Sequence, residues 1–167
     1  MNWEAVSAIG EVAGAVGVIV TLGYLAIQIR QNTKASRITA IQTATENSSR
    51  FSEFLVSHPD VSKVFWQGLR DPEALSPAEL RQFVNTLNVF LRRESVAFYL
   101  HKEGVMPDEL WAARVGTLSG NLNQPGMDLY LEVGGDTLPA EFRDFLREVM
   151  AKPSTMNDKI KRMIVES

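Results

Sequence analysis

Cysteine is absent from this chain of 167 residues, and histidine occurs only at His58 and His101. Disulfides, thiolate zinc sites and cysteine nucleophiles are therefore excluded together. A metal site would depend on carboxylates alone, because no Glu-x-x-His run brings a histidine to the spacing of helical ligands. We therefore expect no metal and no cofactor.

Catalytic and phosphate-binding motifs are also lacking. No serine lies in a Gly-x-Ser-x-Gly elbow, and Gly134-Gly135 lacks the lysine and serine of a phosphate loop. With 17 basic and 20 acidic residues, the net charge of -3 gives no electrostatic case for nucleic acid. The sequence therefore predicts a protein that is not an enzyme and does not bind nucleic acid.

One long apolar run stands out against these absences. The 18 residues from Val12 to Ile29 carry no charged side chain, and about 20 apolar residues span a bilayer. Trp3 and Tyr24 are spaced to place one ring at each membrane interface. We interpret residues 1–30 as a single transmembrane anchor. The alternatives are a buried core helix and a cleaved signal peptide, although a signal peptide begins with basic residues and this chain does not.

Basic residues follow the apolar run and fix the expected orientation. Arg30, Lys34 and Arg37 come directly after it, and no acidic residue appears until Glu46. Positively charged flanks stay in the cytoplasm. The N-terminus is therefore expected outside, and the remaining chain on the cytoplasmic side of the membrane.

Small and weakly polar residues recur along the anchor at spacings of three, four and seven, which places them on one side of the helix. Membrane helices associate through close backbone approach and hydrogen bonds, both of which small residues permit. This small-residue stripe consists of Ser7, Gly10, Gly14, Gly17, Thr21 and Gln28. We interpret it as a contact with a partner protein or with a second copy of the chain. The alternative is the general abundance of glycine in membrane helices.

Glu11 lies close to the small-residue stripe. An acidic residue at membrane depth is a candidate for a pore, a proton path or an ion pair. The alternative places Glu11 at the outer interface, with the span beginning at Val12.

Downstream of the anchor, apolar residues recur with helical periodicity, and no segment alternates as a strand does. The sequence predicts an all-α fold in which residues 31–153 form a bundle of five or six helices and residues 154–167 a loosely held tail. Ser76, Pro77 and Glu79 predict a capped helix start. The expected helices continue from the anchor to Leu55, cover residues 61–69, run from Pro77 to Glu103, from Asp108 toward Pro125, and over residues 138–149.

Glu94 and His101 fall on the apolar face of the longest of these later helices. A buried carboxylate must be paired or neutralised. Two turns separate Glu94 from His101, which is too far for shared metal ligation on one helix. We interpret them as a buried polar pair, tied to Arg37, Gln42 or another group on the first helix. A general acid or base is the alternative.

The chain resembles an uncharacterised family of bacterial membrane-anchored helical proteins. The resemblance covers residues 5–149, and its most specific part runs from Tyr24 to Ala35. It implies a bacterial source, and hence the inner membrane of a bacterium, together with one membrane span and a helical domain. It implies no activity. Where similar proteins carry an arginine and a tryptophan after Pro125-Gly126, this chain has Asp128 and Tyr130.

Three functions follow from these features. The first is a non-catalytic accessory or assembly subunit of a membrane complex, with the lipid bilayer and a membrane protein or a second copy as partners. The second is a homo-oligomeric channel or transport component with Glu11 near its path. The third is a membrane-tethered enzyme that uses Glu94 and His101.

Overall fold

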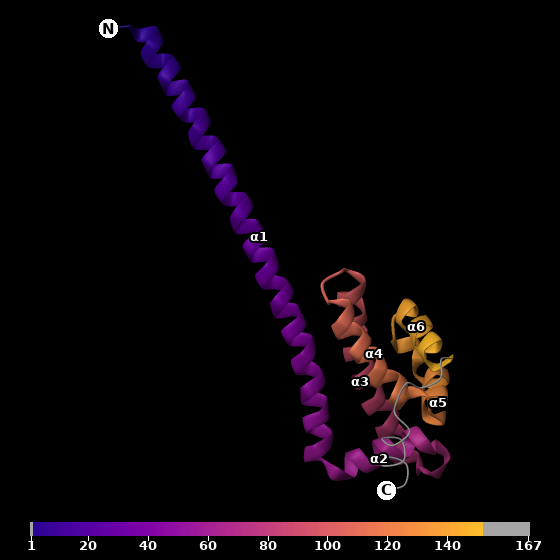
Figure 1. The fold of residues 1–167 in the computed structure, drawn as a ribbon. Coiled ribbons are helices and arrows are strands. Elements are labelled where there is room, and N and C mark those ends of the chain that lie inside the picture. Colours follow the sequence, from indigo (N-terminus) through magenta and orange to yellow (C-terminus); the bar gives the residue numbers. More distant parts are fainter. Residues whose placement is uncertain (1, 152–167) are drawn as a thin grey trace. The chain divides into compact units, whose positions relative to one another are not determined.

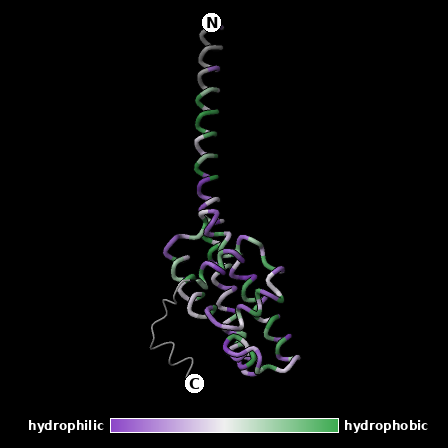
Figure 2. Tube along the Cα trace, turned by 90° about the vertical axis from the view of Figure 1, so that its right-hand side faces the viewer, coloured by the Kyte–Doolittle hydropathy of each residue, from purple (hydrophilic) through white to green (hydrophobic). Residues whose placement is uncertain are grey.

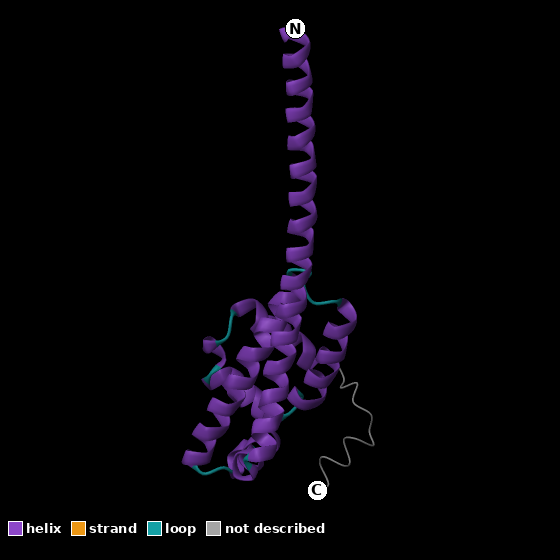
Figure 3. Ribbon diagram, turned by 90° about the vertical axis from the view of Figure 1, so that its left-hand side faces the viewer, coloured by secondary structure: helices purple, strands orange, loops and turns teal. Residues whose placement is uncertain are grey.

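The computed structural model describes residues 2–151, and this part of the chain is helical with no strand. The all-α class predicted from the sequence is therefore confirmed (Figures 1 and 3). Short loops and two 3-10 turns connect the helices. In chain order the elements are α1 (Trp3–Ser57), α2 (Pro59–Arg70), η1 (Pro72–Ala74), α3 (Pro77–Lys102), α4 (Asp108–Leu122), α5 (Pro125–Val133), η2 (Gly135–Thr137) and α6 (Ala140–Ala151).

The chain divides into two units, and α1 contributes to both. The first unit ends at Thr39 and the second begins at Ala40. The anchor expected over residues 1–30 lies within the first unit, which continues beyond the apolar run. After the apolar run, α1 continues through a polar segment that includes Lys34 and Arg37. The part of α1 that belongs to the second unit comes after this segment. The expected tail, residues 154–167, lies outside the described residues.

The N-terminal part of α1 is apolar and exposed. Figure 2 shows a hydrophobic stretch in this helix followed by a hydrophilic one. The segment Gly14–Ser57 is long and apolar enough to cross a membrane, with a mean hydropathy of 1.3 in its most apolar window. No residue of that window is buried, unlike the core helix of a soluble protein. By length and composition alone, a signal sequence passes the same test.

Prolines set the boundary between α1 and α2. The residue before a proline is disfavoured in helical conformation, and α1 ends at Ser57, one residue before His58-Pro59. Pro59 then occupies the first position of α2, where its missing N–H costs nothing. The predicted end of the first helix is therefore confirmed.

A capping box begins α3. The Ser76 hydroxyl accepts from the backbone N–H of Glu79, and the Glu79 carboxylate accepts in return from the backbone N–H of Ser76 at 2.9 Å. Hydrogen bonds from the Ser76 side chain and then from its backbone hold the pKa of Glu79 below its ordinary value. Gly104, which has a φ of 66°, follows the other end of α3 and suits the left-handed conformation there.

The core of the second unit is formed by side chains from α2 to α6 and from the C-terminal end of α1. Helix α2 packs against both α3 and α5. Its Gly68 is needed for this packing, because a Cβ there would lie 2.4 Å from the Phe83 ring. The most deeply buried side chains of the core are Phe83, Leu87, Leu91, Met127, Tyr130, Phe142 and Leu146.

Helix α5 is the main departure from the sequence prediction. We expected Pro125-Gly126 to end a helix, with residues 127–133 as a short segment of unassigned structure. In the structure α4 already ends at Leu122, and Pro125 opens α5 at its first position. Gly126 lies so close to α2 that a Cβ would come within 2.0 Å of the Gly68 carbonyl oxygen. Glycine is required there by a close approach of two backbones rather than by a helix end.

Candidate functional site

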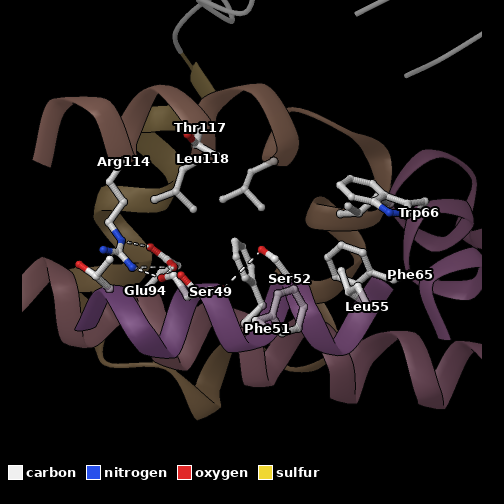
Figure 4. A pocket seen from close by; sticks show the side chains of 15 residues that line it. Ser49, Phe51, Ser52, Leu55, Phe65, Trp66, Glu94, Arg114, Thr117 and Leu118 are labelled. Atoms are coloured by element: carbon white, nitrogen blue, oxygen red, sulfur yellow. Dashed lines mark hydrogen bonds and ion pairs between the residues drawn. The ribbon is translucent and has the colours of Figure 1, made fainter. Parts of the chain in front are cut away.

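A cavity of about 380 Å³ lies between the C-terminal part of α1 and α4. All its lining residues belong to the second unit. Figure 4 shows Leu118 of α4 reaching toward α1, with Glu94 and Arg114 at one end and Phe65 and Trp66 at the other. The cavity is therefore polar at one end and aromatic at the other.

Polar groups from three helices meet at the first end. Arg114 of α4 donates from Nε to Oε2 of Glu94 on α3 at 2.6 Å. The Ser48 hydroxyl of α1 donates to the other carboxylate oxygen of Glu94 at 3.2 Å. Arg114 Nη2 donates to the carbonyl oxygen of Ala44 at 3.3 Å and to the Ser48 hydroxyl oxygen. This network, Ser48–Glu94–Arg114, ties α1, α3 and α4 together.

The network accounts for a buried charge. Glu94 is only 3% exposed, and isolated burial of a carboxylate is very costly. Arg114 neutralises the charge, and both carboxylate oxygens accept hydrogen bonds. The geometry is that of a buried ion pair in which both carboxylate oxygens are hydrogen-bonded.

The pairing predicted for Glu94 is right in part. Its partner on the first helix is Ser48, whereas Arg37 and Gln42 are both exposed. The neutralising charge comes from Arg114, a residue not predicted from the sequence. The signal was present, because Arg114 precedes Leu118 and Leu122 at helical spacing and so carries a charge onto their apolar face.

His101 belongs to a different contact. Its ring stacks on Trp111 with centroids 5.1 Å apart and an interplanar angle of 13°. Its Nδ1 lies 3.4 Å from the Met106 carbonyl oxygen and 3.8 Å from an oxygen of Asp108. His101 is only partly buried, so the buried polar pair expected with Glu94 is not formed. Two turns of α3 separate the residues, and their side chains contact different partners.

Aromatic side chains form the other end of the cavity. Phe51 of α1 contacts Phe65 edge-on at 5.6 Å between centroids, and it packs against Phe90 at 5.1 Å. Trp66 contacts Phe65 edge-on at 5.2 Å and is itself only partly buried. Opposite Leu118, α1 presents small residues, including Ser48 and Ser52. Their short side chains cannot fill the space, which explains why a cavity remains between two packed helices.

Tyr130 lies in the core rather than on the surface. It is fully buried, and its hydroxyl lies 3.4 Å from the Thr137 hydroxyl. Burial raises the pKa of this phenol. Tyr130 therefore contributes to packing, while Asp128 is exposed.

The residues singled out in the first unit lie on an exposed helix. A Cβ added to Gly10, Gly14 or Gly17 would meet nothing within 4 Å. Thr21 donates to the Gly17 carbonyl oxygen at 2.8 Å, and Gln28 donates to the Tyr24 hydroxyl at 2.7 Å. The Ser7 side chain lies outside the described residues. The other residues predicted for this region, all of them exposed, are Glu11, Arg30, Lys34 and Arg37.

Among the described residues, no three histidine, aspartate or glutamate side chains gather as metal ligands would. Comparisons of this chain with models of known protein families, with curated proteins and with solved structures find no match.

Proposed function

We propose that this chain is a single-span membrane protein and a non-catalytic accessory or assembly subunit of a membrane complex. Its first unit crosses the bilayer, and its second unit lies in the cytoplasm. The observation that carries the proposal is the exposure of a long apolar stretch of α1. Each of its large side chains is close to or above half exposed: Val16, Val18, Ile19, Val20, Leu22, Leu25, Ile27 and Ile29.

Lipid is the environment that suits such a surface. Soluble monomers rarely expose contiguous apolar patches of more than a few hundred Å². A helix also satisfies its own backbone hydrogen bonds, as a chain in hydrocarbon must. The basic residues Arg30, Lys34 and Arg37 follow the stretch, which supports a retained anchor with a cytoplasmic domain over a cleaved signal.

The small-residue stripe supports a partner helix. The open space beside Gly10, Gly14 and Gly17 lets a second helix approach the backbone of α1 closely. Nothing comparable points to catalysis. Glu94 is held in a structural ion pair, and His101 stacks elsewhere.

The first test is fractionation. Cells that express the full chain are lysed without detergent, and the membranes are collected by ultracentrifugation and washed with carbonate. We expect the intact chain to stay in the membrane pellet. Intact chain in the supernatant contradicts the proposal.

The second test addresses the partner. Mild extraction followed by affinity purification and mass spectrometry is expected to recover a second membrane protein or a stable oligomer of this chain. Gly14→Leu is expected to reduce that recovery about tenfold, because a large side chain separates the two backbones. Gly23→Leu is the matched control, since Gly23 also has open space beside it and lies across the helix from Thr21. A monomer without a co-purifying partner would contradict this part of the proposal.

A further inference from the structure

We propose that the cavity between α1 and α4 binds a small uncharged amphiphile. Its head group is a hydrogen-bond donor such as an alcohol, and its apolar body lies against the aromatic end. This inference goes beyond the proposed function and does not depend on membrane partners, because every residue that lines the cavity belongs to the second unit.

The size of the cavity suits a small molecule. Ligand sites commonly measure about 300–1,000 Å³ and are mostly apolar, with a few polar groups that orient the ligand. The volume of about 380 Å³ falls at the lower end of this range. A helix with side chains is about 10 Å across, which is too wide for this space. The cavity therefore favours one short chain or ring over a peptide helix.

The charges at the polar end favour a neutral head group. Glu94 and Arg114 are in contact at 2.6 Å, so their formal charges cancel. The pair therefore offers a charged head group no net Coulombic attraction to offset the hydration that the head loses on entering. A neutral head loses less hydration on entering than either ion does.

The hydroxyl groups at the mouth of the cavity favour a ligand whose head group donates a hydrogen bond. Thr45, Ser52 and Thr117 are exposed, and each hydroxyl donates its hydrogen to a carbonyl oxygen one turn earlier in its own helix. All three residues line the cavity, and each oxygen, its hydrogen already donated, can still accept a hydrogen bond. A ligand that supplies an O–H satisfies them, whereas a ligand with acceptors alone does not.

The aromatic end favours an apolar body. Phe51, Phe65 and Trp66 are joined by edge-on contacts, and Leu118 of α4 adds to the apolar lining. Apolar atoms that replace water here contribute about 25 cal/mol per Å² of buried area. Affinity is therefore expected to rise with the length of the apolar body until the space is filled.

The test uses the full chain in lipid nanodiscs and three photoreactive probes. Each probe carries a diazirine on the same medium-chain alkyl group, and the head is an alcohol, a carboxylate or an ammonium. Mass spectrometry then locates the crosslinks, so that partition into lipid does not obscure binding to protein. We expect the alcohol to label α1 between residues 45 and 55 and α4 between 114 and 122, about tenfold more than either charged probe.

Two variants and a control sharpen the result. Ser52→Leu fills the cavity and is expected to abolish labelling by the alcohol, while Thr43→Leu, also exposed on α1 but outside the lining, is expected to leave it unchanged. Thr117→Val removes one acceptor oxygen with little change of volume and is expected to weaken labelling by the alcohol. Equal labelling by all three probes, labelling elsewhere, or labelling that survives Ser52→Leu would overturn the proposal.

Discussion

The environment of Glu94 explains how a charge can lie on an apolar face of α3. The carboxylate is buried, and its oxygens accept from Arg114 and from Ser48. These partners come from two other helices, so the ion pair also fixes how α1, α3 and α4 pack. At this position a single residue affects three elements.

We predict that loss of either charge is costly, while loss of both is not. Arg114→Leu leaves a buried carboxylate without its partner and is expected to cost about 3 kcal/mol. The double variant Glu94→Leu/Arg114→Leu is expected to recover most of that loss, because apolar residues of similar volume tolerate burial. Urea unfolding of the full chain in detergent gives the four free energies of the cycle. Additive effects of the two single substitutions would contradict a direct pair.

The cap of α3 gives a second prediction at this scale. Ser76→Ala removes a hydrogen bond to the first turn, and the expected cost is about 1 kcal/mol. Ser76 lowers the pKa of Glu79. The cap therefore contributes its full stability at pH values above the ordinary pKa range of glutamate. The difference in stability between wild type and Ser76→Ala should then shrink as the pH falls through and below that range. A difference that grows on acidification would contradict this reading of the cap.

Helices whose ends carry local signals could be predicted from the sequence. Ser76-Pro77 and His58-Pro59 act within a few residues of themselves, so the beginning of α3 and the end of α1 were placed correctly. Helix α5 has only nine residues and begins soon after α4 ends, so Pro125-Gly126 at its start is also typical of a helix end. The cavity could not be predicted either, since residues far apart in the sequence bring its walls together.

Two glycines of the second unit test whether a residue acts through its own helix or through packing against another one. Gly126→Ala is expected to destabilise the protein by about 1–3 kcal/mol, because the new methyl group would overlap the Gly68 carbonyl oxygen. Gly116→Ala is the control within α4, where a Cβ meets nothing within 4 Å. Alanine there is expected to stabilise by about 0.5–1 kcal/mol through helix propensity. Thermal melting measures the stability of both variants. A Gly126→Ala variant as stable as the wild type would contradict the close approach of α2 and α5.

For the whole molecule, the two units differ in what stabilises them. The second unit buries an aromatic and aliphatic core, whereas the first exposes its apolar side chains on a single helix. A helix of this kind gains little from burial within its own chain. We therefore expect its environment, rather than its own packing, to decide where it lies.

The absence of cysteine permits a direct test of orientation. Under the proposed topology, Arg30, Lys34 and Arg37 hold the following chain in the cytoplasm, which leaves Asn2 outside. Asn2→Cys is then expected to react with a membrane-impermeant maleimide in intact spheroplasts. Glu73→Cys, at an exposed position of η1, should react only after the membrane is permeabilised. Because the parent chain has no thiol, any label reports the introduced residue alone. The opposite labelling pattern would reverse the topology, and equal labelling of both positions in sealed spheroplasts would exclude a single fixed orientation.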